Sequence, residues 1–406
     1  MNAAMERNVR LLMVFETSRY LLFWLPVFFL YFSSILPLED VLLLEAVYYF
    51  GLVLLEVPSG WFSDRVGRRV TLLIAMAAQT VGGVLFVTTS SLLPFLVGQL
   101  CLAASEAFVS GTNNAMLYDS LSVVGREREI GAQSETMVSR GFLGLAISSL
   151  IGGVLAGFDM RIAYALAAAA GIAAFGLAWR MVEPAHPPAA DESADRGQVS
   201  FFSVFGKLRD GTLLWVFAFA VAMTVFDHVP YEFLQPYIGF LTAGYGQGDY
   251  APTPAVSGCL LCVMMLLASW SATRAMALSD RFGWGPALLL CMALQGAIIV
   301  GMMLVLHPAI LLLIALRAVP MGLWYPMMNA IVQPKLDRGI RATYLSLQSL
   351  AGSLAFSGTL FLASWAVGDV ATLNAELMST VLMVYGIGVV VVLLALLAGI
   401  DKLHQD

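Results

Sequence analysis

Charged residues are scarce in this sequence. They make up 12% of the 406 residues, and 60% are hydrophobic, whereas about 25% of a soluble globular domain is charged. The formal net charge is −6 and the sequence pI is about 5.3. Because a nucleic-acid-binding protein needs a basic surface, this charge balance predicts no nucleic-acid partner.

Histidine and cysteine are also rare, with four of each in the sequence. The cysteines lie inside apolar runs, so we predict no disulfide framework. Cys259 and Cys262 have the spacing of half a zinc site, but no second ligand pair follows, which favours two thiols in a helix. The sequence contains neither a nucleophile motif nor a phosphate-binding loop. These absences predict no metal, no cofactor and no enzymatic activity.

Long apolar runs account for most of the chain, and its mean hydropathy is +0.84. Each run of roughly 20 residues is long enough to cross a hydrocarbon core of about 30 Å. In lipid the backbone amides must pair within the segment, so each run is expected to be a helix. The sequence therefore predicts an all-α membrane protein with twelve transmembrane helices, at about residues 9–34, 38–58, 70–89, 92–120, 129–157, 160–182, 211–241, 253–278, 284–305, 308–333, 341–367 and 375–401.

The basic residues are distributed very unevenly over these spans. With a cytoplasmic N-terminus, only Arg161 falls on the outer side among the basic residues placed between spans. Cytoplasmic loops of membrane proteins are enriched in lysine and arginine. This asymmetry predicts an even number of spans with both termini in the cytoplasm.

One polar interval, residues 183–210, divides the chain into two halves. It contains prolines and acidic residues and ends in Phe201, Phe205 and Leu208 at helical spacing, which predicts a short interfacial helix. The expected organisation is a six-helix bundle over 1–182, a cytoplasmic linker over 183–210 and a second bundle over 211–406.

Three short matches between the halves, shifted by about 215 residues, support an internal repeat. They are Ser63–Gly67 with Ser279–Gly283, Asn114-Ala115 with Asn329-Ala330, and Gln133-Ser134 with Gln348-Ser349. Repeated halves around a midplane site are a transporter architecture.

A motif between the second and third spans resembles the loop signature of the major facilitator superfamily. It reads Gly60-x-x-x-Asp64-Arg65-x-Gly67-Arg68-Arg69, and Asp280-Arg281-x-Gly283 repeats part of it between spans eight and nine. The resemblance covers the whole chain. It implies a monomeric secondary transporter with two pseudo-symmetric six-helix halves. It also implies that these residues, together with Asp119, form a gating network at the cytoplasmic helix ends.

A narrower resemblance concerns a prokaryotic group of this superfamily. It rests on Glu56-x-Pro58-Ser59-Gly60 and on the stretch from Ser110 to Leu121. It implies a place in a prokaryotic cytoplasmic membrane. The markers of drug/proton antiporters are incomplete: the stretch 99–103 lacks their span-four arginine, and the stretch 144–153 lacks their central Gly-Pro. The motifs therefore do not predict efflux by the common mechanism of drug/proton antiporters.

Ionisable residues inside the predicted spans are the candidates for substrate binding and proton coupling. A charge at the middle of a span costs about 2.5–3.5 kcal/mol on insertion scales, so it is retained for a reason. Arg317 is a candidate for an anionic substrate group, since guanidinium binds carboxylate or phosphate bidentately. The full set is Glu16, Arg19, Glu106, Arg140, Asp227, His228 and Arg317.

Each of these candidates has a plainer interpretation. Glu16 and Arg19 are three residues apart on one helix and can neutralise each other. Glu106 either carries a proton or substrate, or is a static partner for an arginine. Asp227 and His228 serve either coupling or an outer gate. Four aromatic residues either stack on a ring-bearing substrate or simply pack, namely Tyr231, Tyr237, Trp324 and Tyr325.

These observations predict a proton-coupled carrier that moves a small organic molecule across the bilayer by alternating access, with export favoured over import. An importer of organic anions, and an importer or flippase of amphiphiles or lipids, remain alternatives with the same fold. A transporter-like receptor that no longer cycles is an alternative of another class. Intact gate motifs and several midplane charges favour the carrier.

Overall fold

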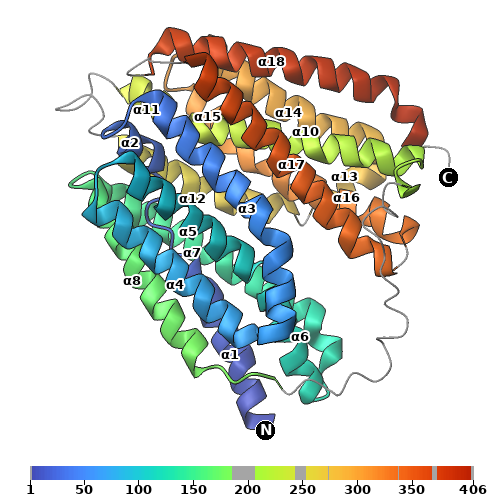
Figure 1. The fold of residues 1–406 in the computed structure, drawn as a ribbon. Helices are drawn as coiled ribbons and strands as arrows, with labels where there is room; N and C mark the ends of the chain where they lie inside the picture. Colours follow the sequence, from blue (N-terminus) through green and yellow to red (C-terminus); the bar gives the residue numbers. More distant parts are fainter. Residues whose placement is uncertain are drawn as a thin grey trace. The chain divides into compact units, whose positions relative to one another are not determined.

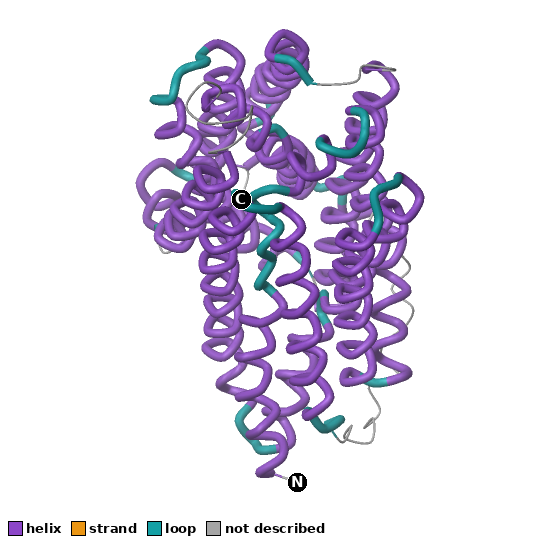
Figure 2. Tube along the Cα trace, turned by 90° about the vertical axis from the view of Figure 1, so that its left-hand side faces the viewer, coloured by secondary structure: helices purple, strands orange, loops and turns teal. Residues whose placement is uncertain are grey.

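The computed structural model describes residues 2–184, 206–242, 253–272, 274–336, 338–367 and 373–403. Within these ranges every regular element is an α-helix or a 3-10 helix, as Figure 2 shows. The chain forms two compact units, one made of residues 1–190, 251–262 and 360–372, the other of 191–250, 263–359 and 373–406. Most of the predicted linker, with Phe201 and Phe205, lies outside the described residues, so the boundaries 1–182, 183–210 and 211–406 stay a prediction.

The helices that precede the linker region are separated by short turns. They are α1 (Asn2–Arg19), α2 (Phe28–Ser33), α3 (Leu38–Val66), α4 (Arg68–Thr88), α5 (Leu92–Val109), α6 (Thr112–Val123), η1 (Glu127–Glu129), α7 (Ile130–Ala156) and α8 (Met160–Arg180).

The helices that follow the linker region include several short pieces. They are α10 (Gly211–Glu232), α11 (Leu234–Thr242), α12 (Thr253–Ala272), α13 (Ala275–Phe282), α14 (Trp284–Leu304), α15 (Ile310–Ile314), η2 (Ala315–Arg317), α16 (Ala318–Lys335), α17 (Arg338–Val367), α18 (Ala375–Ala398) and η3 (Ile400–Leu403).

Ten segments of the described chain are long and apolar enough to cross a membrane. They correspond to the third through twelfth predicted spans. The first two predicted spans fall on α1 with α2 and on α3, which are not among the ten. Helices α1 and α3 carry several acidic and basic residues, and α2 is only 6 residues long. The prediction of an all-α membrane fold is confirmed.

Several predicted spans are not single helices. The span at 9–34 was wrong as one helix, because α1 ends at Arg19 and α2 begins only at Phe28. The span at 92–120 is divided at Gly111, whose φ of 74° lies in the left-handed region. The span at 308–333 passes through the 3-10 turn η2. The residues between Arg19 and Phe28 are largely apolar, so hydropathy gave no indication of the first break.

The span at 211–241 divides at Phe233, where α10 gives way to α11. Pro236 lies in the first turn of α11. Proline is tolerated there because the first turn of a helix has no acceptor for its missing N–H.

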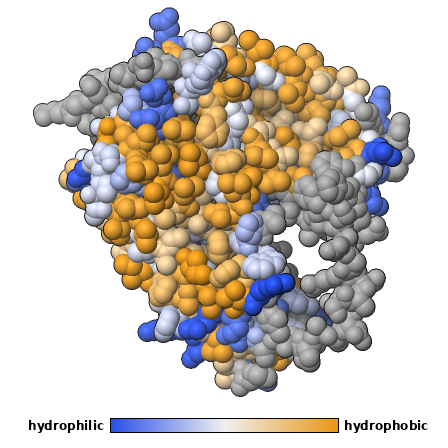
Figure 3. Space-filling model, viewed as in Figure 1, coloured by the Kyte–Doolittle hydropathy of each residue, from blue (hydrophilic) through white to orange (hydrophobic). Residues whose placement is uncertain are grey.

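Apolar side chains cover the sides of the helices. Only 22% of the most apolar window of α18 is buried, and Leu312 and Trp365 are 77% and 83% exposed. Figure 3 shows apolar residues over most of the visible face of α3, α4 and α5, with hydrophilic residues gathered at the helix ends. Lipid is the medium that such a surface requires.

Close helix contacts hold the first unit together. In Figure 1, α4 lies beside α5 and α8, and both pairs are in contact. Gly82 and Gly83 are placed where a Cβ atom would come within 3.0 Å of the Gly98 carbonyl and of Ala168. Small residues of this kind let transmembrane helices approach closely. Helix α8 also contacts α1, and α4 also contacts α6.

Candidate functional site

Three of the predicted charged residues meet in the first unit. Arg19, at the C-terminus of α1, donates from Nε to Glu16 Oε2 at 2.7 Å and from Nη1 to Glu106 Oε2 at 3.1 Å. Asn113, near the start of α6, donates from its amide to the other oxygen of Glu16. We call Glu16, Arg19, Glu106 and Asn113 the Arg19 cluster.

Burial differs strongly within the Arg19 cluster. The side chains of Glu16 and Arg19 are 2% and 8% exposed, whereas that of Glu106 is 43% exposed. A cavity of about 230 Å³ borders all four members. When both carboxylates are ionised, the two glutamates and one arginine leave one negative charge unbalanced. The half-exposed Glu106 is the carboxylate of the cluster that a solute in the cavity reaches most readily.

The surrounding contacts fix Arg19 in place. Its guanidinium lies 3.9 Å from the centre of the Tyr20 ring, and its carbonyl accepts a hydrogen bond from Gln79 Nε2 at 3.2 Å. A guanidinium over an aromatic face is a favourable cation–π arrangement. The breaks after Arg19 and at Gly111 both adjoin this cluster, so interrupted helices surround the charges. Interrupted helices are typical of transporter sites.

Other carboxylates and cations of the first unit lie apart from this cluster. Arg140, a predicted candidate on α7, is exposed and is not among the described residues that line the 230 Å³ cavity. Glu45 on α3 is 7% exposed and accepts a hydrogen bond from Gln99 Nε2 at 3.0 Å. Gln99 occupies the stretch in which the drug-antiporter arginine was missing, and here it satisfies a buried glutamate.

A second charged pair lies in the other unit. Arg317, at the end of η2, donates from Nη1 to the Asp227 carbonyl at 2.6 Å and reaches Asp227 Oδ1 at 3.5 Å. Its guanidinium also lies 5.1 Å from the centre of the Tyr231 ring. Among the described residues no acceptor lies within hydrogen-bond distance of its buried Nε. The carboxylate contact is long, so part of the guanidinium's donor capacity is not used by Asp227.

The remaining candidates of this unit have packing contacts. His228 Nδ1 donates to the Thr224 carbonyl at 2.6 Å, and its ring lies 4.9 Å from that of Phe356. Tyr237 is fully buried and donates to the Val305 carbonyl. Trp324 is buried and packs edge-on against Phe219, whereas Tyr325 is 54% exposed. Of the four predicted aromatic residues, only Tyr231 contacts one of the predicted charges in the described structure.

The signature motif between α3 and α4 forms a hydrogen-bonded turn. Arg68 donates from Nε to Asp119 Oδ2 at 3.4 Å and from Nη1 to Ser63 Oγ at 2.9 Å. Arg65 instead lies over the Trp61 ring at 4.7 Å. Asp119, which the family resemblance placed in the gating network, is thus in contact with Arg68. The side chain of Asp64 lies outside the described part of the structure.

Glu183, which follows α8, completes this turn and was not recognised from the sequence. Its two carboxylate oxygens accept from the backbone N–H groups of Arg68 and Arg69 at 2.7 and 2.8 Å. A carboxylate at a helix N-terminus satisfies unpaired donors and interacts favourably with the helix dipole. Glu183 lies at the edge of the polar interval, so its sequence position suggested only a solvated residue.

The repeat of the motif has the same backbone turn without the same side-chain contacts. Gly67 and Gly283 have φ values of 115° and 82°, and each one separates two helices. Each of their N–H groups donates to the carbonyl of the serine four residues earlier. Asp280 and Arg281 are both exposed. The internal repeat therefore reproduces the turn locally.

A model of a known protein family covers most of the chain. The model of a family described as the Major Facilitator Superfamily matches residues 13–360. No curated protein matches the chain in sequence.

Solved structures resemble the chain over nearly its whole length. The nucleoside transporter NupG has a TM-score of 0.77 at 13% identity, and the match covers 97% of this chain and 98% of that protein. An auto-inhibited POT family peptide transporter has a TM-score of 0.72 at 13% identity, with 97% and 96% covered. A bacterial homolog of the human lysosomal transporter Spinster has a TM-score of 0.70 at 16% identity, with 98% and 96% covered. At these identities the likeness establishes the fold.

Proposed function

The chain belongs to the major facilitator superfamily of secondary transporters, and we propose that it exchanges protons for a small organic molecule by alternating access. The multi-pass helical fold and the solved transporters that resemble it support transport rather than catalysis. We further propose that it acts as a monomer in a prokaryotic cytoplasmic membrane with both termini in the cytoplasm. The intact motif at Gly60–Arg69 and the concentration of arginines on one side of the predicted spans support this orientation.

The observation that carries the coupling proposal is the charge imbalance of the Arg19 cluster. Arg19 neutralises Glu16, with which it is buried, and its second contact reaches Glu106, which is half-exposed beside a cavity. A proton or a positively charged group of the substrate neutralises the remaining carboxylate. Because both neutralise the same group, they compete, and competition at one carboxylate is a simple basis for proton antiport. This arrangement favours an organic cation or zwitterion as the substrate, and export as the direction.

A second candidate substrate class rests on Arg317. Its buried Nε has no acceptor among the described residues, and its carboxylate contact is 3.5 Å long. An organic anion can occupy donors of this kind, since a guanidinium presents five N–H groups. The amphiphile and receptor alternatives have no comparable observation in their favour.

Ligand stabilisation of the purified protein tests these classes. A ligand that binds only the folded state raises its stability by RT ln(1 + [L]/Kd). We expect organic cations to raise the melting temperature more at alkaline than at acidic pH, because protons compete for Glu106. A nucleoside joins the panel of cations, anions and zwitterions because a similar structure is that of a nucleoside transporter.

The substitution Glu106→Gln separates coupling from simple binding. We expect this variant to lose the pH dependence of cation stabilisation, and we expect Glu45→Gln, a buried glutamate outside the cavity, to keep it. Cation stabilisation that is equal at both pH values in the wild-type protein argues against the proposal. A Glu106→Gln variant with the full wild-type pH dependence does so too.

A further inference from the structure

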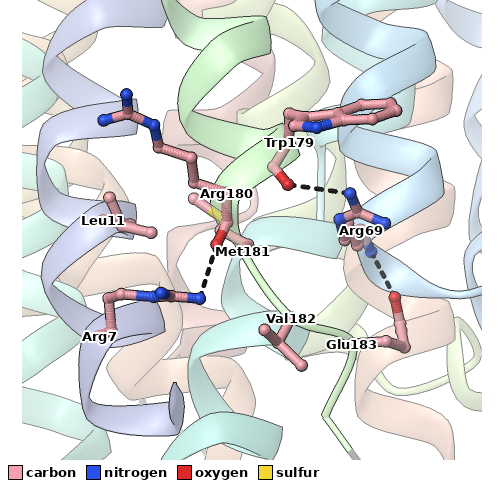
Figure 4. A pocket seen from close by; sticks show the side chains of 8 residues that line it. All are labelled: Arg7, Leu11, Arg69, Trp179, Arg180, Met181, Val182 and Glu183. Carbon is pink, nitrogen blue, oxygen red and sulfur yellow. Dashed lines mark hydrogen bonds between the residues drawn. The ribbon is translucent and has the colours of Figure 1, made fainter. Parts of the chain in front are cut away.

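A second cavity, of about 750 Å³, lies where the ends of α1, α4 and α8 meet (Figure 4). Three arginines border it, namely Arg7 of α1, Arg69 of α4 and Arg180 of α8. Among the described residues, Glu183 is the only acidic one that borders this cavity. The transport proposal gives the cavity no role, because it is separate from the Arg19 cluster.

The cavity lies at the level of a membrane surface. Arg180 is the last residue of the candidate span Met160–Arg180, and Arg69 is the second residue of the span Arg68–Thr88. Trp179, which also borders the cavity, is 61% exposed. Tryptophan is enriched at the boundary between lipid and water, where its ring and its N–H suit the two media. A ligand in this cavity therefore meets the headgroup layer.

The charges of the cavity favour an anion. Both carboxylate oxygens of Glu183 are engaged by the N–H groups at the start of α4. Arg7 and Arg69 each donate one hydrogen bond to a carbonyl at the end of α8, as the dashed lines in Figure 4 show. The buried Nε of Arg69 has no acceptor among the residues that the structure describes. Three guanidiniums and one carboxylate leave two positive charges beside the cavity, which favours a group rich in oxygen, such as a phosphate.

An apolar face continues from this basic cavity along both helices. Leu11 borders the cavity and Val14, which is 53% exposed, follows it on the same face of α1 as Arg7. On α8, Ile172 is 60% exposed, and a Cβ atom added to Gly176 would meet nothing within 4 Å. Both residues share a helix face with Arg180. An acyl chain fits this surface, whereas a soluble phosphate compound would leave it uncovered.

We propose that this cavity binds an anionic phospholipid. Arg7, Arg69 and Arg180 supply the positive charge that attracts the phosphate, and an acyl chain lies along the faces of α1 and α8. Because the cavity joins the ends of three helices, an occupant stabilises the bundle at the end that carries the signature motif. The site thus couples the transporter's stability to the anionic lipid content of the membrane.

Stabilisation by defined lipids in detergent tests this proposal. We expect phosphatidylglycerol to raise the melting temperature of the delipidated protein more than phosphatidylcholine does. Added salt should shrink the difference, since ions screen exposed charges. Native mass spectrometry of the wild-type protein gives a second readout that needs no variant. We expect the protein to retain phosphatidylglycerol in preference to phosphatidylcholine. Equal effects of the two lipids overturn the proposal, and so does an equal effect of inorganic phosphate, which would indicate a simple phosphate site.

Matched variants locate the effect on the protein. We expect Arg7→Gln with Arg180→Gln to lose most of the phosphatidylglycerol shift and the lipid preference in native mass spectrometry. Arg10→Gln, which removes an exposed arginine of α1 that does not border the cavity, should keep both. If Arg10→Gln loses as much of the phosphatidylglycerol shift as the double variant does, the lipid is attracted by the general surface charge of the protein. That result would refute a defined site.

Discussion

At the scale of single residues, Arg19 is the centre of the candidate transport site. It holds one buried and one half-exposed carboxylate, at 2.7 and 3.1 Å. Removing one partner of a buried ion pair costs more than the pair itself contributes, because the other charge stays buried without compensation. Glu16, at 2% exposed, is the residue that Arg19 compensates.

A double-mutant comparison tests this role of Arg19. We predict that Arg19→Met lowers the free energy of unfolding by about 3–5 kcal/mol, the usual range for a broken buried pair. Adding Glu16→Gln to Arg19→Met should restore most of the loss, because the uncompensated charge is then removed. Thermal unfolding in detergent measures both variants. A double variant as unstable as the single one would show that packing, not charge, explains the loss.

The Arg317 pair makes a prediction about anions. Asp227 occupies part of the Arg317 guanidinium, so Asp227→Asn should strengthen stabilisation by organic dicarboxylates, and Arg317→Gln should abolish it. Each variant is compared with its own unliganded melting temperature, which removes the effect of the substitution on folding. If Arg317→Gln keeps the wild-type shift, the Arg317 pair has only a structural role.

At the scale of elements, the breaks in the helices are as informative as the helices themselves. α1 ends at Arg19, α5 and α6 separate at Gly111, and η2 ends at Arg317. Each break therefore adjoins a buried charge or its partner. A break leaves backbone donors and acceptors for the site, which a continuous transmembrane helix does not.

The turn at Gly67 makes a prediction with a control inside the same chain. Gly67 and Gly283 have similar backbone angles, and an L-residue in this conformation costs about 1–3 kcal/mol. A Cβ atom at Gly67 would also lie 2.9 Å from the Glu183 carboxyl carbon, whereas at Gly283 its nearest neighbour is 3.8 Å away. We predict that Gly67→Ala lowers the melting temperature more than Gly283→Ala. Combining Gly67→Ala with Glu183→Ala should cost less than the sum of the two. Equal losses at the two glycines would show that Glu183 does not hold this turn.

At the scale of the whole molecule, hydropathy and charge predicted the membrane fold, and a short motif predicted the family. The apolar runs predicted the ten candidate spans, and the motif at Gly60–Arg69 predicted the family. The family resemblance also placed Asp119 in the same network as the arginines of the motif, but it did not say which arginine Asp119 contacts. The spacing of Glu16 and Arg19 also allowed their pairing to be weighed. Each of these features is local or repeats a known pattern.

The rest of the site depends on contacts between distant segments. Arg19 and Glu106 are 87 residues apart, and the bonds from Glu183 to Arg68 and Arg69 cross 115 and 114 residues. No rule about the spacing of residues predicts contacts between segments so far apart in the sequence. The break between Arg19 and Phe28 could not be predicted for another reason. The residues of this segment are as apolar as those of a transmembrane helix, so hydropathy does not distinguish the two.

The central claim is that Glu106 takes up and releases the coupled proton, and infrared difference spectroscopy tests it without a known substrate. The protein is reconstituted in membranes, and spectra are recorded as the pH is changed from alkaline to acidic. A carboxylate that gains a proton gives the carbonyl stretch of a carboxylic acid. We predict such a band in the wild-type protein, its loss in Glu106→Gln and its persistence in Glu45→Gln. A carboxylic-acid band that titrates unchanged in Glu106→Gln would contradict the account.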